Sequence, residues 1–145
     1  MNKEEILFQL NASSSDTLMQ TLGIVYTDFT GDTLTAEMDV TSTVHQPMKF
    51  LHGGASLAMA ETVGSFLSIT TVNISEYHVF GTQVNGYHLK SVKNGKLTAT
   101  AKFINKGKTS HIVEISIYCT DENGNTFKNC HVTMTNRIVP KNNFA

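Results

Sequence analysis

Between Lys49 and Glu76 the sequence carries a single charged residue, Glu61. Small residues dominate this stretch, and a glycine pair at 53–54 opens it, so we expect a long helix from there to about Thr70. Small side chains let other backbone approach from every side, which favours a central helix. The length would suit a membrane span, but a charge mid-way, three glycines and many hydroxyl side chains favour a buried helix of a soluble domain.

Outside this stretch, the second half of the chain alternates between apolar and polar residues. This alternation is typical of half-buried strands, and Gly- and Asn-rich segments separate them. We expect short helices at 3–10 and 18–23, and strands at 23–29, 33–40, 79–90, 96–105, 110–120 and 127–137. The intervening turns are expected at 30–32, 93–95, 106–108 and 121–125.

Turn positions alone predict strand registers. If Asn-Gly centres the last hairpin, Val113 lies opposite Met134; if Gly107 centres the preceding one, Ala99 lies opposite Ile115. One apolar face then crosses three strands. We therefore expect a hairpin, the long helix and then an antiparallel meander, which together form an α+β domain with one helix on a five- or six-stranded sheet. A single domain over 1–145 is expected.

The bulk composition excludes several classes of protein. The formal net charge is −1 without a basic stripe, so neither nucleic acid nor an anionic membrane is an expected partner. The N-terminus lacks the apolar core of a signal peptide, and a cytoplasmic protein is expected. Cys119 and Cys130 form no CxxC pattern, so we expect free thiols and no metal site.

Glu61 is the first candidate for chemistry. No opposite charge lies three or four positions away on the helix, while Ser65, one turn on, could hold the carboxylate through its hydroxyl. A desolvated carboxylate is a candidate general base or nucleophile. The alternatives are a core-edge carboxylate paired with a lysine, and a helix position that reaches solvent.

The second candidate is the segment His52-Gly53-Gly54. The first N–H groups of a helix have no internal partner and favour negative charge, so this segment could stabilise an oxyanion. The alternatives are a flexible glycine entry to the helix and, for His52, a histidine that caps the loop by a backbone hydrogen bond. Glu61 lies eight residues beyond Gly53, about 12 Å along a helix. The two groups can meet at one substrate only if two copies of the helix pack antiparallel, which implies a C2 dimer.

The segment HQPMKFLHGGASLAMAE, at 45–61, resembles the signature of hotdog-fold acyl-CoA thioesterases. It is most similar to the branch that contains the 4-hydroxybenzoyl-CoA, phenylacetyl-CoA and 1,4-dihydroxy-2-naphthoyl-CoA thioesterases. The resemblance extends through 84–90 and 107–109. It implies a hotdog fold, in which a sheet wraps around the long helix, and a homodimer, with dimers pairing into tetramers.

The resemblance also implies residue roles. Glu61 matches the catalytic carboxylate, and the N–H of Gly53 matches the oxyanion donor. Gln46 matches the glutamine that positions the carbonyl or the water, although a solvated loop amide is the alternative. His52 matches a histidine near the thioester sulfur, and Ser65 matches a hydroxyl that orients water or carboxylate.

Further family positions, which contact substrate and coenzyme A, fall on Asn85, His88, Lys90, Lys108, Thr109 and Ser110. Lys90 stands where the family has arginine; lysine supplies charge but no bidentate fork. For residues 108–110, ordinary hairpin-turn chemistry is an equal alternative.

The resemblance predicts an acyl-CoA thioesterase that acts on aryl-CoA or medium-chain acyl-CoA esters and needs no metal or redox cofactor. Two alternatives stay open. One is a non-catalytic hotdog protein that binds acyl-CoA or an acyl carrier. The other is a hotdog dehydratase or hydratase, which would also use a helix carboxylate and a histidine.

Overall fold

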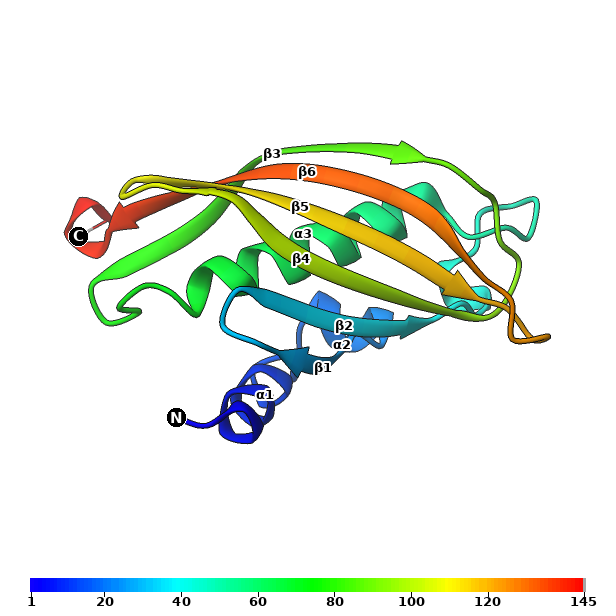
Figure 1. Ribbon diagram of the computed structural model, residues 1–145, viewed down its shortest axis with the longest axis horizontal. Coiled ribbons are helices and arrows are strands. Elements are labelled where there is room, and N and C mark those ends of the chain that lie inside the picture. The colour runs from blue at the N-terminus through cyan, green and yellow to red at the C-terminus, as the bar shows by residue number, and fades with distance from the viewer. Residues whose placement is uncertain (145) are drawn as a thin grey trace.

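One long helix lies against a curved six-stranded antiparallel sheet in the computed structural model, which describes residues 1–144 (Figure 1). The helices are α1 (Lys3–Ala12), α2 (Leu18–Leu22) and α3 (Gly53–Ile69), with 3-10 turns η1 (Ser42–Val44) and η2 (Lys141–Phe144). The strands are β1 (Val25–Phe29), β2 (Thr33–Asp39), β3 (Tyr77–His88), β4 (Lys96–Lys106), β5 (Ser110–Thr120) and β6 (Thr126–Pro140). The predicted α+β architecture is confirmed. Within the described residues, no helix combines the length and the apolar character that a membrane crossing requires.

Helix α3 is the centre of the core, as its small residues predict. It contacts β2, β3, β4, β5 and β6. Gly64 shows why a small residue is needed, because a Cβ there would overlap Met134 Sδ and lie 3.1 Å from Ile115 Cδ1. The glycine therefore lets the helix approach the sheet more closely than a larger residue would.

The order of the strands differs from the predicted meander. The sheet runs β1-β2-β4-β5-β6-β3, so β3 pairs with β6 at one edge and β4 pairs with β2. Residues 93–95 therefore form no hairpin turn but part of a connection between strands that are not neighbours. Only β4, β5 and β6 form a meander.

One predicted register is confirmed and the other is wrong. Val113 lies opposite Met134, as expected. Ala99 lies opposite Ile117 rather than Ile115, because the turn is centred between Lys108 and Thr109, beyond Gly107, and the extra residue Ile104 takes back only part of that shift. The two-residue shift leaves the same side chains on the core face, since the side-chain period of a strand is two.

Two glycines of β3 bring this edge strand against α3. A Cβ on Gly81 would lie 2.6 Å from Glu61 Oε1, and a Cβ on Gly86 would lie 2.5 Å from Leu57 Cδ2. Leu57 and Glu61 are one turn apart on the helix. Thus β3 crosses α3 at two points where it has no side chain.

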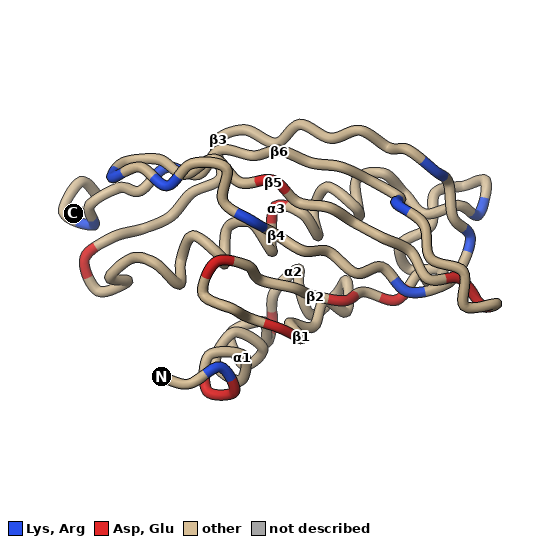
Figure 2. The backbone as a smooth tube through the Cα atoms, viewed as in Figure 1, with Lys and Arg blue, Asp and Glu red and all other residues tan. Residues whose placement is uncertain are grey.

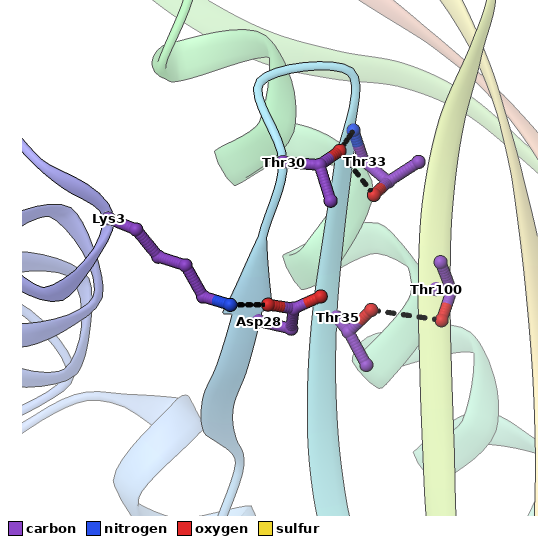
Figure 3. A network of polar contacts seen from close by, with 6 residues as sticks. All are labelled: Lys3, Asp28, Thr30, Thr33, Thr35 and Thr100. Atoms are coloured by element: carbon purple, nitrogen blue, oxygen red, sulfur yellow. Dashed lines mark hydrogen bonds and ion pairs between the residues drawn. The ribbon is translucent and has the colours of Figure 1, made fainter.

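The β1–β2 hairpin lies at the edge of the sheet opposite to β3, and α1 packs against β1. Lys3 of α1 pairs with Asp28 of β1, which holds the pKa of that carboxyl below its usual range (Figure 3). The Thr35 and Thr100 hydroxyls lie 3.1 Å apart across β2 and β4. These contacts join α1 and the β1–β2 hairpin to the rest of the fold.

Candidate active site

The start of α3 offers a free backbone donor, the Gly53 N–H. His52 is the N-cap residue, and its Nδ1 accepts a hydrogen bond of 2.8 Å from the Gly54 N–H. The capping interpretation of His52 is therefore confirmed. The Gly53 N–H has no hydrogen-bond partner among residues 1–144. It lies at the positive end of the helix dipole, where an anionic oxygen would be stabilised.

A cavity of about 280 Å³ opens at this helix end. Its walls come from the loop before α3, from α3 itself, from the segment after β3 and from β6: Gln46, Leu51, Gly53, Ser56, His88, Leu89, Lys90, Ser91, Val92 and Asn129. Four residues singled out from the sequence, Gln46, Gly53, His88 and Lys90, therefore gather here.

Gln46 is held by a tight loop. Its backbone N–H donates to the Phe50 carbonyl at 2.7 Å, and its side-chain oxygen accepts from the Met48 N–H. Lys49 takes the left-handed conformation, with φ of 70°, that closes this loop. Met48 stands at the loop tip with 73% of its surface exposed. The side chain of Gln46 is thus ordered at the cavity, but an exposed apolar residue flanks it.

His88 lies directly on Gly53. A Cβ at position 53 would lie 2.8 Å from His88 Nε2, so the imidazole occupies the space that a side chain would need. Gly53 therefore has two physical roles, since it leaves room for the ring and presents an unpaired N–H.

Asn129, which closes the cavity from β6, was not predicted from the sequence. Ile117 pairs with Cys130 and Tyr118 with Lys128, so Asn129 is the extra residue of a β-bulge. Its side chain is 3% exposed, and its Nδ2 donates to the Lys90 carbonyl at 2.6 Å. Ser56 Oγ donates to Asn129 Oδ1 at 3.4 Å. The bulged asparagine therefore ties the segment after β3 to the first turn of α3.

Glu61 lies at a second cavity, of about 260 Å³, which Ser65, Phe66 and Leu18 also line. The carboxylate is exposed in the single chain, and no ion pair engages it within residues 1–144. The expectation of a desolvated carboxylate is therefore wrong for one chain, in which the helix position reaches solvent. Ser65 Oγ donates to Asn136 Oδ1 at 3.3 Å rather than to Glu61.

The remaining predicted contacts lie elsewhere. Lys108 and Thr109 lie in the turn between β4 and β5, and Ser110 begins β5; this turn is at the end of the sheet opposite to the loop before α3 (Figure 1). Lys108 lines a third cavity, of about 450 Å³. Asn85 is exposed on β3. Figure 2 shows that most lysines and arginines gather toward the two ends of the molecule. One chain thus does not bring these residues to Gly53.

Known proteins resemble this chain over most of its length. The Thioesterase superfamily profile matches residues 48–125. The proofreading thioesterase EntH of Klebsiella pneumoniae is 38% identical over 130 residues, which cover 90% of this chain and 93% of that protein. A crystal structure of thioesterase PA1618 from Pseudomonas aeruginosa has a TM-score of 0.86 at 38% identity, covering 92% of this chain and 94% of that one.

A second crystal structure, thioesterase HI1161 of Haemophilus influenzae, has a TM-score of 0.84 at 33% identity, covering 92% of this chain and 90% of that one. Sequence and fold therefore agree over most of the chain. The chain belongs to the thioesterase superfamily and has its hotdog fold.

Proposed function

We propose that this protein is an acyl-CoA thioesterase, which hydrolyses an acyl-CoA to the free acid and coenzyme A. The observation that carries the proposal is the unpaired Gly53 N–H at a helix N-terminus, in a cavity that Gln46 shares. A thioester carbonyl oxygen that gains negative charge during attack would be stabilised by such a donor. The relationship to a proofreading thioesterase supports the same reaction class.

In this proposal Glu61 either attacks the acyl carbon itself as a nucleophile or acts as the general base for an attacking water. In both routes a C–O bond forms at the acyl carbon, the C–S bond breaks, and coenzyme A leaves as a thiolate that takes up a proton. A second step with water would release the acid from an acyl-Glu61 anhydride. This proposal assigns to Ser65, which lines the same cavity, the orientation of the attacking water, since its hydroxyl proton goes to Asn136 and its oxygen can still accept.

The proposed site is shared between two chains. Glu61 and Gly53 lie at different cavities, about 12 Å apart along α3 by helix geometry. Strand β3 has a neighbour on one side only, which leaves one edge of a 12-residue strand unpaired in the described chain. Unpaired strand edges are templates for association. Antiparallel pairing of two such edges would set two α3 helices side by side and antiparallel.

This C2 arrangement accounts for the features that one chain leaves incomplete. The exposed Met48 loop and the exposed Glu61 would both be covered, and residues 108–110 of one chain would approach the Gly53 end of the other. Lys90 and the lysines of the β4–β5 turn then offer charge for coenzyme A phosphates. Pairing of such dimers into tetramers belongs to the same proposal.

The acyl group in this proposal is an aryl group, as in 1,4-dihydroxy-2-naphthoyl-CoA or phenylacetyl-CoA, or a medium-length aliphatic chain. Apolar side chains beside Glu61 support this choice, because Leu18, Ala58 and Phe66 line its cavity. A kcat/KM comparison across aryl and aliphatic CoA esters separates the two groups.

The activity is tested by the release of free thiol from a panel of CoA esters, measured colorimetrically. We expect Glu61→Gln to lower kcat by several orders of magnitude while circular dichroism and the oligomeric state stay unchanged. Hydrolysis by Glu61→Gln at the wild-type rate would remove Glu61 from the mechanism. Binding of CoA esters without release by the wild type would favour a non-catalytic binding protein.

The shared site is tested by mixing inactive variants. Glu61→Gln and Gln46→Ala chains, unfolded together and refolded, should form mixed dimers with one working site of two. We expect partial recovery of activity in the mixture but none in either variant refolded alone. Mixed dimers that stay inactive would refute the shared site without refuting the activity.

A further inference from the structure

His88 is held between a buried thiol and the start of α3. Its Nδ1 lies 3.7 Å from Cys130 Sγ, within hydrogen-bond range for sulfur. On the other side of the ring, His88 Nε2 lies against Gly53. The pairing of β3 with β6 creates this arrangement, because His88 and Cys130 stand opposite each other at the end of the ladder.

The thiol favours one of the two neutral tautomers of the ring. Cys130 is fully buried, and burial raises the pKa of its thiol, so the S–H proton is retained near neutral pH. An S–H group is a weak donor, whereas the lone pair of a neutral imidazole nitrogen is a good acceptor. We therefore expect the S–H group to donate to Nδ1. The neutral ring then carries its own proton on Nε2, the nitrogen that faces the helix start.

We propose that His88, through its Nε2–H, is a second hydrogen-bond donor to the thioester carbonyl oxygen beside the Gly53 N–H, and that Cys130 is a positioning residue that fixes this tautomer. The inference rests on the proposed thioesterase activity and assigns to His88 a role at the reacting carbonyl. The resemblance had placed His88 among the contacts to coenzyme A. No proton is transferred to the substrate in this role.

The alternative role makes a different kinetic prediction. A contact to the nucleotide of coenzyme A would affect KM, and the effect would vanish with a substrate that lacks the nucleotide. A donor to the carbonyl oxygen acts mainly in the transition state, so its loss lowers kcat on either substrate. The pair of substrates is the acyl-CoA and the N-acetylcysteamine thioester of the same acid.

For His88→Phe, which keeps a ring but has no N–H, we expect kcat to fall by about 10²- to 10³-fold on both substrates. His88→Gln, whose amide offers an N–H near the Nε2 position, should recover part of the loss. A rise in KM for the acyl-CoA alone, with normal kinetics on the N-acetylcysteamine thioester, would overturn the proposal.

Cys130 is tested with a matched control. Cys119 is equally buried on the neighbouring strand, but its Sγ donates to the Asn94 carbonyl and does not contact His88. We expect Cys130→Ala to lower kcat several-fold and Cys119→Ala to leave it unchanged, although both remove one buried sulfur. Cys130→Ser, which keeps an O–H donor, should retain more activity than Cys130→Ala. Equal effects of the two alanine variants would refute the positioning role.

The tautomer can also be measured directly by NMR, without an activity assay. The ¹⁵N chemical shifts of His88 should show a protonated Nε2 and an unprotonated Nδ1 in the wild type, and a mixture in Cys130→Ala. A protonated Nδ1 in the wild type would overturn the assignment.

If Glu61→Gln is inactive while His88→Phe is normal, only this inference fails. If the wild type releases no thiol from any ester, the proposed function fails as well.

Discussion

Asn136 provides the sharpest test of how α3 is held on the sheet. The side chain is fully buried on β6. Its Nδ2 donates to the Gly64 carbonyl at 3.1 Å and to Ser68 Oγ at 2.8 Å, and its Oδ1 accepts from Ser65 Oγ at 3.3 Å. One amide thus joins β6 to the helix turn that follows Glu61. Asn136→Ala removes all three hydrogen bonds together.

The expected loss follows from those three bonds. A hydrogen bond contributes a net ~1 kcal/mol to stability, and buried partners that stay unpaired add to the loss. We therefore expect Asn136→Ala to lower the free energy of unfolding by about 3 kcal/mol. Ser65→Ala, which removes only the longest of the three bonds, should cost about 1 kcal/mol.

The assay is urea unfolding followed by far-ultraviolet circular dichroism. The protein concentration must be the same for every variant, because association shifts apparent stability. Thr133→Ala is the matched control, since this residue lies on β6 with its side chain on the other face, and its loss should stay below about 1 kcal/mol. If Asn136→Ala lies within 1 kcal/mol of wild type, the burial of the amide cancels its bonds and the reasoning is refuted.

Three further predictions concern single side chains. The buried Tyr26 hydroxyl has no partner among the described residues, so Tyr26→Phe should raise the free energy of unfolding by about 1 kcal/mol in urea; a loss of stability would contradict this. Burial, aided by the nearby Lys106, lowers the pKa of His111 in the folded chain. At pH values between this lowered pKa and the ordinary histidine value, the unfolded chain therefore binds more protons than the folded chain. Stability should therefore fall as the pH drops through that range, and His111→Gln should flatten the profile in urea titrations at several pH values; an equally steep profile would contradict this. Gly81→Ala should displace the Glu61 carboxylate and lower kcat about 100-fold, while Gly86→Ala, which meets Leu57 instead, should lower it less; equal losses would show that Glu61 had not moved.

The hairpins show why residue pairing is harder to predict than strand position. The register of β5 on β6 was predicted correctly at Val113, but two offsets cancelled there. The hairpin is centred on Asn123 rather than between Asn123 and Gly124, which shifts the register by one residue, and the bulge at Asn129 shifts it back by one. Ile104 is the corresponding extra residue of β4. The alternating pattern alone does not place such an extra residue, which bends its strand and increases the local twist.

The candidate site was predictable where it depends on local chain geometry. A glycine pair at a helix start and a loop glutamine a few residues earlier are local features, and both lie where the sequence places them. Asn129 and Cys130 are different, because their roles depend on the pairing of β3 with β6. The predicted meander excluded that pairing, so no local pattern linked His88 to Cys130.

The exposure of Glu61 in the single chain bears directly on assembly. The apolar run predicts that its surroundings exclude water, yet the carboxylate is exposed in one chain. Both statements hold together if the apolar surface around Glu61 is completed from outside the chain. Phe66 and Leu18 beside Glu61, Met48 on its loop and the unpaired edge of β3 are surfaces that a second copy would cover. Desolvation would then arise on assembly, and with it the environment that activates a carboxylate. Dilution that separates the chains should therefore abolish activity before it unfolds them.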